Sequence, residues 1–299
     1  MGATKHGYLI TAYKDLAALE ELVDELGPDA VIYVHLDRRS QFSSTELQHL
    51  RSRPEVRYLS RRYRVRWGSR AHLLAMIDLA SKAVNDGLAD RLHLISGSDR
   101  PVWSQERMTA FFDADPQAEY LLHFPLPTTY WKDGGLDRLS YYHPLDLLDL
   151  RRPKHRRLRD LLLVAQRKGG IQRSLEGLPL LFGGSSWWSL TTACVAEVLR
   201  FSDAHPEFLR RLWMTHVPEE VFFPTLVMAS PFAQHVVNDH LRYMDWIPRN
   251  GNNPAVLDMG DAERIERSGK LFARKLDHPV STTLMEHLAD RRKGPDPMN

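Results

Sequence analysis

Residues 7–36 read GYLITAYKDLAALEELVDELGPDAVIYVHL. The two ends of this stretch, 7–13 and 30–36, are short apolar runs rich in β-forming residues, so we expect buried strands there. Between them, apolar residues recur at the spacings of one helix face, at Leu16, Leu19, Leu22, Val23 and Leu26. Gly27-Pro28 ends that helix. The stretch therefore predicts a β-α-β unit of the open α/β class.

The same alternation continues toward the middle of the chain. We expect further strands at 56–60, 91–97 and 118–123, a helix with Leu73 to Ala80 inward, and a short helix at 105–112. In open α/β sheets the ligand binds at the carboxyl ends of the strands. The loops that follow these strands are therefore the expected site.

The second half of the chain is less regular. Residues 126–180 are interpreted as an excursion over the site that contains one basic amphipathic helix, between Arg151 and Lys168. Beyond it we expect order at 183–190, helices at about 192–201, 207–214, 219–229 (broken by Pro224) and 261–268, and an aromatic-rich strand at the end of 235–246. The polar tail from Arg291 is expected to be disordered.

The composition is that of a globular protein, with 43% hydrophobic and 26% charged residues among 299. Lys and Arg (40) nearly balance Asp and Glu (38), and the net charge of +2 argues against a nucleic-acid partner. The single cysteine, Cys194, excludes an internal disulfide. No apolar run approaches the 18 or so residues of a membrane span, and the N-terminus shows no leader. We expect a cytoplasmic protein, at most peripheral at the inner membrane.

Six stretches in this order resemble the core-2/I-branching β-1,6-N-acetylglucosaminyltransferase family, glycosyltransferase family 14, which includes the peptide O-xylosyltransferases. The resemblance points to a bacterial member. The stretches are the first strand ending at Ile10, His35 to Ser40, Arg66-Trp67-Gly68, Ile95 to Pro101, Gly184-Ser185-Ser186-Trp187 followed by Pro218 to Phe223, and Leu241 to Trp246 with Leu271 to Lys275.

The resemblance implies a GT-A type fold, which is α/β with a Rossmann-like open mixed sheet flanked by helices. It implies one glycosyltransferase domain over 1–290, with a nucleotide-binding half at about 1–125, the acceptor-side excursion at 126–180 and a catalytic and phosphate-binding half at 181–290. Residues 291–299 would be the tail. It also implies a UDP-sugar donor, inversion at the anomeric carbon and no metal cofactor.

The resemblance assigns the general base to Glu220. Inverting transfer needs a carboxylate that takes the proton of the acceptor hydroxyl. The neighbouring Glu219 points about 100° away on a helix, so only one of the two can face the donor. The alternative is a structural role, because a carboxylate after Pro218 also stabilises a helix N-terminus.

The UDP leaving group needs positive charge as its bond breaks. The resemblance gives this role to Arg274 and Lys275, which as fixed cations replace a metal. A solvated basic pair is the alternative. An Asp-x-Asp metal motif also occurs, at Asp113-Ala114-Asp115, but Pro116 follows it and favours a helix-stop loop.

The remaining assignments also come from the resemblance. For the nucleotide they are Ile10, Asp37, Val65, Arg66, Trp67, Ser96, Gly97 and Asp99. For the donor sugar or acceptor they are Ser185, Ser186, Trp187 and Glu219, with Trp131 and Tyr142 as a sugar-stacking platform. Turn and core roles are the alternatives for Asp37, Asp99, Trp67 and the platform.

Two positions depart from the family pattern. Ala12 stands where the first strand of relatives continues into a histidine, and Ser186 stands where the xylosyl branch has an aspartate. Ser186 counts against xylose, and many bacterial relatives are labelled N-acetylglucosaminyltransferases. We therefore favour N-acetylglucosamine as the transferred sugar, in polysaccharide biosynthesis, with UDP-xylose as the alternative donor. A further alternative is a protein that binds nucleotide or glycan without transfer.

The basic run supports a third interpretation. Its cations are Arg151, Arg152, Lys154, Arg156, Arg157 and Arg159. Residues 151–168 would then be an adaptor for an anionic membrane or polymer. A solvated helix face is the alternative.

Overall fold

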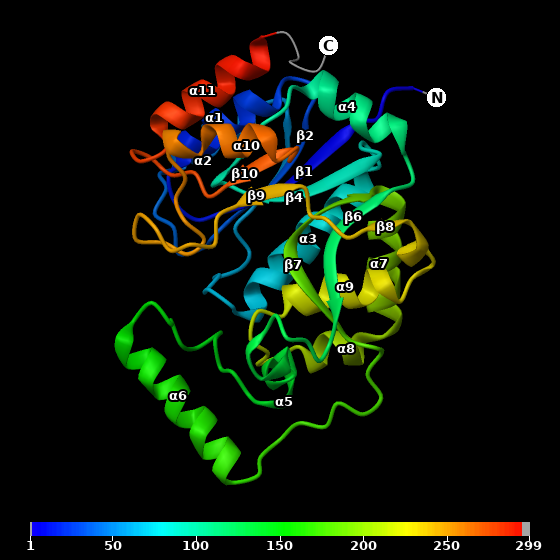
Figure 1. The fold of residues 1–299 in the computed structure, drawn as a ribbon, viewed down its shortest axis with the longest axis vertical. Helices are drawn as coiled ribbons and strands as arrows, with labels where there is room; N and C mark the ends of the chain where they lie inside the picture. Colours follow the sequence, from blue (N-terminus) through cyan, green and yellow to red (C-terminus); the bar gives the residue numbers. More distant parts are fainter. Residues whose placement is uncertain (1, 295–299) are drawn as a thin grey trace.

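The computed structural model describes residues 2–294. Its centre is a seven-stranded sheet in the order β3-β2-β1-β4-β7-β6-β8. The strands are β1 (His6–Ala12), β2 (Val31–Leu36), β3 (Val56–Ser60), β4 (Arg91–Ser96), β6 (Glu119–Pro125), β7 (Phe182–Thr191) and β8 (Val236–Val237). The first four are mutually parallel, and β7 runs antiparallel to both β4 and β6. The predicted α/β class with an open mixed sheet is confirmed (Figure 1).

Helices cover both faces of this sheet. The helices around it are α1 (Leu16–Leu26), α2 (Ser44–Ser52), α3 (Arg70–Asp86), α4 (Gln105–Ala114), α7 (Thr192–Ala204), α8 (Pro206–Arg211), α9 (Glu219–Met228) and the 3₁₀ turn η2 (Pro231–His235). Alternate residues of β1 serve the two faces, as a strand requires. Tyr8 and Ile10 join the core under α1, α2 and α4, whereas Leu9 joins the core under α3, α7 and α9.

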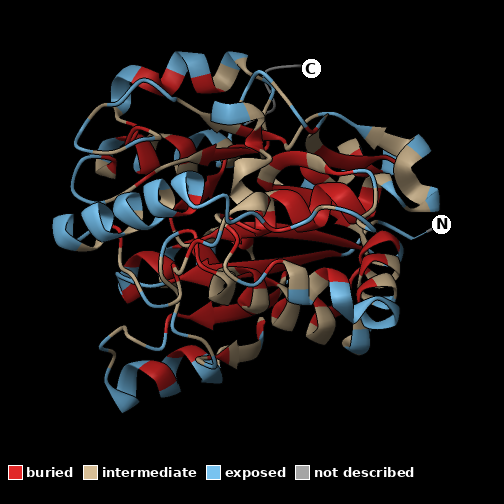
Figure 2. Ribbon diagram, turned by 90° about the horizontal axis from the view of Figure 1, so that it is seen from below, coloured by how far each residue is buried: buried red, intermediate tan, exposed pale blue. Residues whose placement is uncertain are grey.

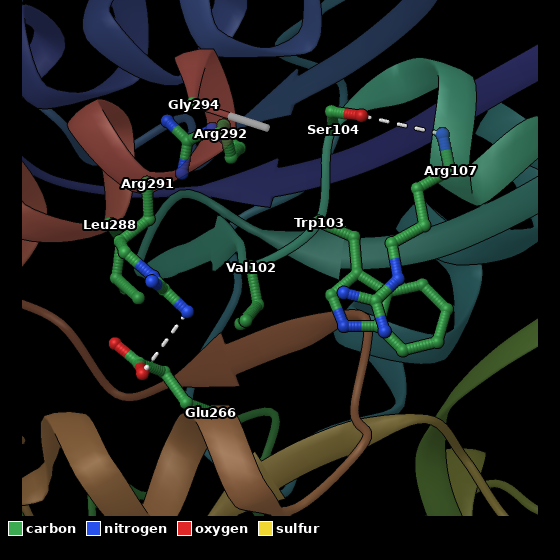
Figure 3. Close-up of a pocket in the computed structure, with 9 residues that line it drawn as sticks. All are labelled: Val102, Trp103, Ser104, Arg107, Glu266, Leu288, Arg291, Arg292 and Gly294. Atoms are coloured by element: carbon green, nitrogen blue, oxygen red, sulfur yellow. Dashed lines mark hydrogen bonds and ion pairs between the residues drawn. The ribbon is translucent and has the colours of Figure 1, made fainter. Parts of the chain in front are cut away.

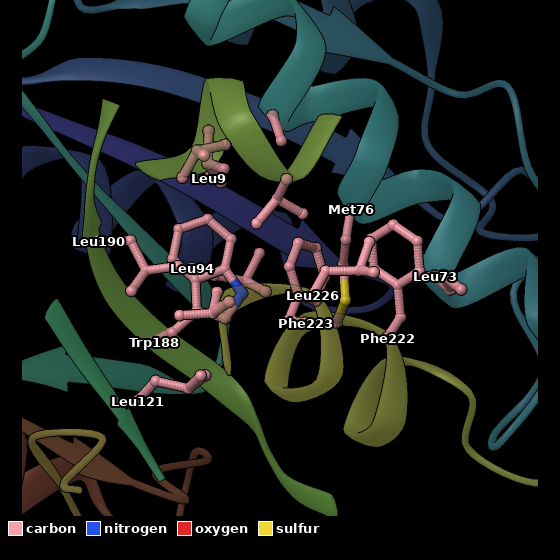
Figure 4. Close-up of a cluster of buried hydrophobic side chains, with 14 of the residues drawn as sticks. Leu9, Leu73, Met76, Leu94, Leu121, Trp188, Leu190, Phe222, Phe223 and Leu226 are labelled. Carbon is pink, nitrogen blue, oxygen red and sulfur yellow. The ribbon is translucent and has the colours of Figure 1, made fainter. Parts of the chain in front are cut away.

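The α3 side holds the larger aromatic packing. Figure 4 shows Leu9 and Trp188 from the strands against Met76 of α3 and Phe222 and Phe223 of α9. Buried residues concentrate on the strands and on the inward faces of the helices (Figure 2). This core holds α9 in place, so that the first turn of the helix lies near the carboxyl end of β1.

A second, three-stranded sheet joins distant parts of the chain. Its order is β5 (Asp99–Pro101), β10 (Phe272–Arg274) and β9 (Arg242–Met244), covered by η3 (Met259–Asp261), α10 (Ala262–Arg267) and α11 (Thr282–Lys293). The antiparallel register pairs Arg274 with Asp99. The small sheet therefore carries the expected phosphate-binding residues to the end of β4.

The segment between β6 and β7 forms the excursion expected there. It contains η1 (Lys132–Gly135), α5 (Asp137–Ser140) and α6 (Pro153–Lys168). In Figure 1, α5 lies below α9 and α6 stands away from the body.

Two expectations need correction, and one needs an addition. Helix α9 continues through Pro224 to Met228, so the expected break is wrong, and the proline ring packs where Gly184 of β7 has no side chain. The strand expected at the end of 235–246 is found as β9 of the small sheet, and the structure adds β8 at Val236–Val237 in the main sheet. The expected disorder from Arg291 is wrong for the first residues, since α11 extends to Lys293 and Arg292 lies 3.1 Å from Glu25. Residues 295–299 lie outside the described residues.

Candidate active site

Loops from β1, β2 and β4 meet at the carboxyl end of β1. The Gly97 N–H donates to the Thr11 carbonyl at 3.1 Å, and the Asp37 N–H donates to the Ala12 carbonyl at 2.9 Å. Parallel strands end at the same sheet edge, where open α/β proteins bind ligands. Two of the predicted nucleotide residues, Asp37 and Gly97, are thus hydrogen-bonded to the same short backbone segment at the end of β1.

Asp37 is buried and orders the loop after β3. Its carboxylate accepts from the Arg39 guanidinium, with Nη2 2.8 Å from Oδ2, and from the Val65 N–H at 3.2 Å. The same guanidinium donates to the Val65 carbonyl. Asp37 and Arg39 therefore hold the Val65 peptide from both sides, in the loop that leads to Arg66 and Trp67.

Arg66 and Trp67 face the excursion. The Arg66 guanidinium donates to the Asp146 carbonyl. The exposed Trp67 ring meets His216 edge-on, with the ring centroids 5.4 Å apart. The next residue, Gly68, has a positive φ of 73° and accepts from the Val217 N–H at 3.0 Å. This turn therefore packs against the loop that leads into α9.

Ser96, Asp99 and Arg274 form one cluster, in which Ser96 and Asp99 are buried and Arg274 is partly exposed. Arg274 Nη1 lies 2.9 Å from Asp99 Oδ2 and also contacts Ser96 Oγ. The guanidinium lies over Trp187, 4.4 Å from the ring centroid. Three residues predicted to bind the nucleotide or its phosphates are thus in mutual contact, and Trp187, predicted for the donor sugar or acceptor, lies against one of them. The Arg274 charge is already paired with Asp99.

Lys275 is less strongly paired than Arg274. Its Nζ lies 3.4 Å from Asn252 Oδ1 and 3.6 Å from Asp277 Oδ2, while Lys14 approaches the same Asp277 oxygen to 3.0 Å. Lys275 is therefore the cation of the pair whose charge is more available to a ligand.

Glu219 and Glu220 begin α9 and diverge, as neighbouring helical residues must. Glu219 is buried, and its Oε1 lies 2.8 Å from His72 Nδ1. The other ring nitrogen of His72 lies 3.4 Å from Thr11 Oγ1. Glu219 is therefore connected through α3 to the end of β1.

Glu220 contacts the excursion instead. Its Oε2 accepts from Arg138 Nη1 at 2.7 Å, and 26% of its side chain remains exposed. Burial raises the Glu220 pKa to about 7, with Glu219 also raising it and Arg138 opposing the rise. A carboxylate with such a pKa can hold or release a proton near neutral pH.

The two aromatic residues predicted to form a sugar-stacking platform have different surroundings. Trp131 lies beside the Glu220 pair, because the Arg138 guanidinium stacks 3.6 Å from its ring centroid. Tyr142 lies elsewhere on the excursion and meets Arg173 at 5.0 Å. His72 and Arg138 were not identified from the sequence. For His72, the sequence offered one signal, a histidine within the apolar pattern of α3. No sequence pattern pointed to Arg138.

Three further predicted residues lie in or next to the core. Ile10 is fully buried on the α1 side of the sheet, and Ser186 is buried in β7. Ser185 Oγ accepts from the Trp187 N–H at 3.1 Å. The two serines therefore lie in the strand that carries Trp187 beneath Arg274.

The Asp-x-Asp motif lies apart from these residues. Asp113 belongs to α4 and accepts hydrogen bonds from Thr4, and Asp115 ends the helix. Within residues 2–294, no three His, Cys, Asp or Glu side chains are grouped as metal ligands. A small pocket of about 90 Å³ lies between the α4 N-terminus and α11, with Glu266, Arg291 and Trp103 in its wall (Figure 3). None of the predicted site residues lines it.

Comparison with known proteins gives one family. The family model described as Core-2/I-Branching enzyme matches residues 7–266. Xylosyltransferase 2 of Canis lupus familiaris is 27% identical over 278 residues, covering 86% of this chain and 30% of that protein. Xylosyltransferase oxt of Drosophila melanogaster is 24% identical over 294 residues, covering 90% and 31%. The chain spans about a third of the length of these relatives.

Solved structures give a weaker likeness. Core-mannan synthase A from Aspergillus fumigatus aligns over 78% of this chain and 72% of that chain, at 9% identity and a TM-score of 0.37.

Proposed function

The chain belongs to the Core-2/I-Branching enzyme family, and on that premise we propose that it is an inverting glycosyltransferase that moves a sugar from a UDP-sugar to an acceptor hydroxyl. Glu220 is the general base of this proposal. Arg274 and Lys275 stabilise the UDP leaving group.

The chemical step balances without a further reactant. As the acceptor oxygen attacks the anomeric carbon, its proton passes to the Glu220 carboxylate. The bond from that carbon to the UDP oxygen breaks on the opposite face, and the electron pair leaves with UDP. The configuration at the carbon is thereby inverted.

The observation that supports Glu220 most strongly is its setting. It is a partly exposed carboxylate with a pKa of about 7, at the start of α9 and paired with Arg138, in a helix whose leading loop is hydrogen-bonded through Val217 to Gly68 of the loop after β3. Glu219 is the weaker candidate, because it is buried against His72. A base whose pKa lies near the working pH combines availability with proton affinity.

The leaving group is assigned to cations of the chain. Lys275 offers direct contact with a phosphate, since its present partners lie at 3.4 Å or more. Arg274 supports it from the Asp99 cluster. A fixed cation can stabilise the developing charge that a metal ion neutralises in other transferases. We therefore propose transfer without a divalent metal.

Two sugars are the candidates for the group that is transferred. N-acetylglucosamine follows from the resemblance and from Ser186, a hydroxyl where the xylosyl branch carries a carboxylate. Xylose is favoured by the relatives, which are named xylosyltransferases. The acceptor is a glycan or another hydroxyl compound.

The test is release of UDP and transfer with each donor, in EDTA, against a panel of hydroxyl acceptors. Glu220→Gln should lower turnover by at least roughly 10² while UDP binding persists. Glu207→Gln is the matched control, because Glu207 is an exposed carboxylate in the first turn of α8. It should leave turnover unchanged.

Two outcomes would contradict the proposal. Full turnover by Glu220→Gln would remove the base assignment. UDP binding without transfer to any acceptor would favour the alternative, a family member that binds nucleotide or glycan without catalysis.

A further inference from the structure

Helix α6 presents an apolar face to solvent. Leu158, Leu161 and Leu162 recur at the spacing of one helix face and are 45%, 67% and 38% exposed. Ala165 continues the same row and is also exposed. Soluble proteins rarely leave such a row uncovered without a partner.

The orientation of α6 is set by polar contacts on its other side. Gln166 exchanges hydrogen bonds with the Tyr142 backbone, at 2.8 and 3.0 Å. Arg167 pairs with Asp133 at 2.7 Å, and His155 Nδ1 accepts from the Asp149 N–H at 3.0 Å. These contacts hold the inner side of α6 against the rest of the excursion. The leucine row consequently faces outward, on the helix that stands apart in Figure 1.

Cations border the leucine row along one side, at Arg157 and Lys168, and at its N-terminal end, at Lys154. Lys154, Arg157 and Lys168 are exposed and form no ion pair with another residue of 2–294. Asp160 is the sole acidic residue of α6, and it pairs with Arg159 at 2.7 Å. An apolar row bordered by cations is the pattern of helices that lie in a membrane interface.

We propose that α6 docks the protein on an anionic lipid bilayer. The leucine row enters the boundary between headgroups and acyl chains, and Lys154, Arg157 and Lys168 meet the lipid phosphates. At 16 residues the helix is about 24 Å long and lies along the surface. In the described part of the chain no helix is long and apolar enough to span a bilayer.

Charge and chemistry select this occupant over two others. A soluble anionic polymer matches the cations but leaves the leucines in water. A second copy of α6 covers the leucines but brings two sets of unpaired cations together, which is repulsive. An anionic bilayer can both take up the leucine side chains and pair its phosphates with the neighbouring cations.

The test is co-sedimentation of the whole chain with vesicles of phosphatidylcholine alone or with one quarter phosphatidylglycerol. We expect binding to the anionic vesicles only. Leu158→Ser with Leu161→Ser should weaken it by roughly tenfold or more. Lys154→Glu with Arg157→Glu should weaken it at least as much.

Matched controls lie at the other end of the molecule. Val280→Ser removes an apolar side chain that is 44% exposed, and Arg51→Glu reverses a cation on α2. Both should bind vesicles like the unchanged protein. Far-ultraviolet circular dichroism checks that every variant is folded.

Three outcomes would overturn the proposal. The first is equal binding by the serine variant, which would leave only electrostatic attraction. The second is no binding to anionic vesicles at low salt. The third is self-association, seen by sedimentation velocity, that the serine variant abolishes in the absence of vesicle binding. None of these readouts depends on transfer activity, so they are independent of the proposed function.

Discussion

Glu219 and Glu220 are neighbours in the chain with different surroundings. Glu219 is buried against His72, and Glu220 is partly exposed beside Arg138. Their separation follows from the helix, because successive side chains point about 100° apart. One carboxylate is thus held by the fold while the other retains access to a ligand.

The Glu220–Arg138 pair predicts a pH dependence. The carboxylate form is the base, so turnover should fall as the pH drops through about 7. Arg138 lowers the Glu220 pKa. Arg138→Gln should therefore shift the acidic limb of the pH profile, where activity falls, to higher pH. The measurement is kcat/KM against pH.

Arg210→Gln, an exposed cation of α8, is the control and should leave the limb in place. A limb that stays fixed in Arg138→Gln, or moves to lower pH, would contradict the assignment of Glu220 as the titrating base.

The Glu219–His72 contact predicts a loss of stability. His72→Ala leaves a buried carboxylate without its partner, and Glu219 Oε2 already has none within the described residues. We expect the free energy of unfolding to fall by about 2–4 kcal/mol. Urea denaturation followed by tryptophan fluorescence measures it.

His72→Gln keeps a donor within reach of the carboxylate and should recover part of the loss. A change below about 0.5 kcal/mol in His72→Ala would show that water satisfies Glu219.

At the scale of the elements, β7 depends on one glycine. A Cβ on Gly184 would lie 2.0 Å from the Leu122 carbonyl oxygen and 2.9 Å from Pro224 Cγ. The β6–β7 pairing is irregular between Leu121 and His123, which brings that carbonyl to the glycine. The glycine therefore permits both the strand pairing and the close packing of α9 on β7.

Gly184→Ala should destabilise the protein by about 3 kcal/mol or more, because the clash involves backbone that cannot move independently. Thermal denaturation and soluble yield measure the effect. Gly294→Ala is the control, since its Cβ would meet nothing nearer than 3.6 Å. A melting temperature like that of the control would contradict this account of β7.

At the scale of the whole molecule, the small sheet joins segments that lie far apart in the chain. It sets Arg274 beside Asp99, which lies 175 residues earlier. A nucleotide that contacts Asp37, Asp99 and Lys275 would therefore stabilise both sheets together.

UDP at about 100 times its Kd should raise the melting temperature by roughly 5 °C in EDTA. Lys275→Ala should lose most of this shift, whereas Lys293→Ala, at the exposed end of α11, should keep it. Differential scanning calorimetry measures the shift. A shift that requires manganese would contradict the assignment of fixed cations to the phosphates.

Sequence patterns predicted most of the main sheet and its helices. The strands around Ile10 and Val34 and the helix of Leu19 and Leu22 follow from local periodicity, because each apolar residue must reach the same core. The missed helix α2 also had a local signal, the capping box of Ser43 and Glu46. The predicted roles of the site residues remain predictions, although Ser96, Asp99, Trp187 and Arg274 prove to be in contact.

The sequence by itself determined the α/β class, the family and a set of candidate residues, since these depend on order and spacing along the chain. Only the tertiary structure decided their partners. His72 reaches Glu219 across 147 residues, and Arg138 reaches Glu220 across 82. Such pairs arise from the packing of α3, α5 and α9, and a one-dimensional pattern carries no record of which side chain meets which. The outward direction of the α6 leucines was decided in the same way, by polar contacts on the opposite side of that helix.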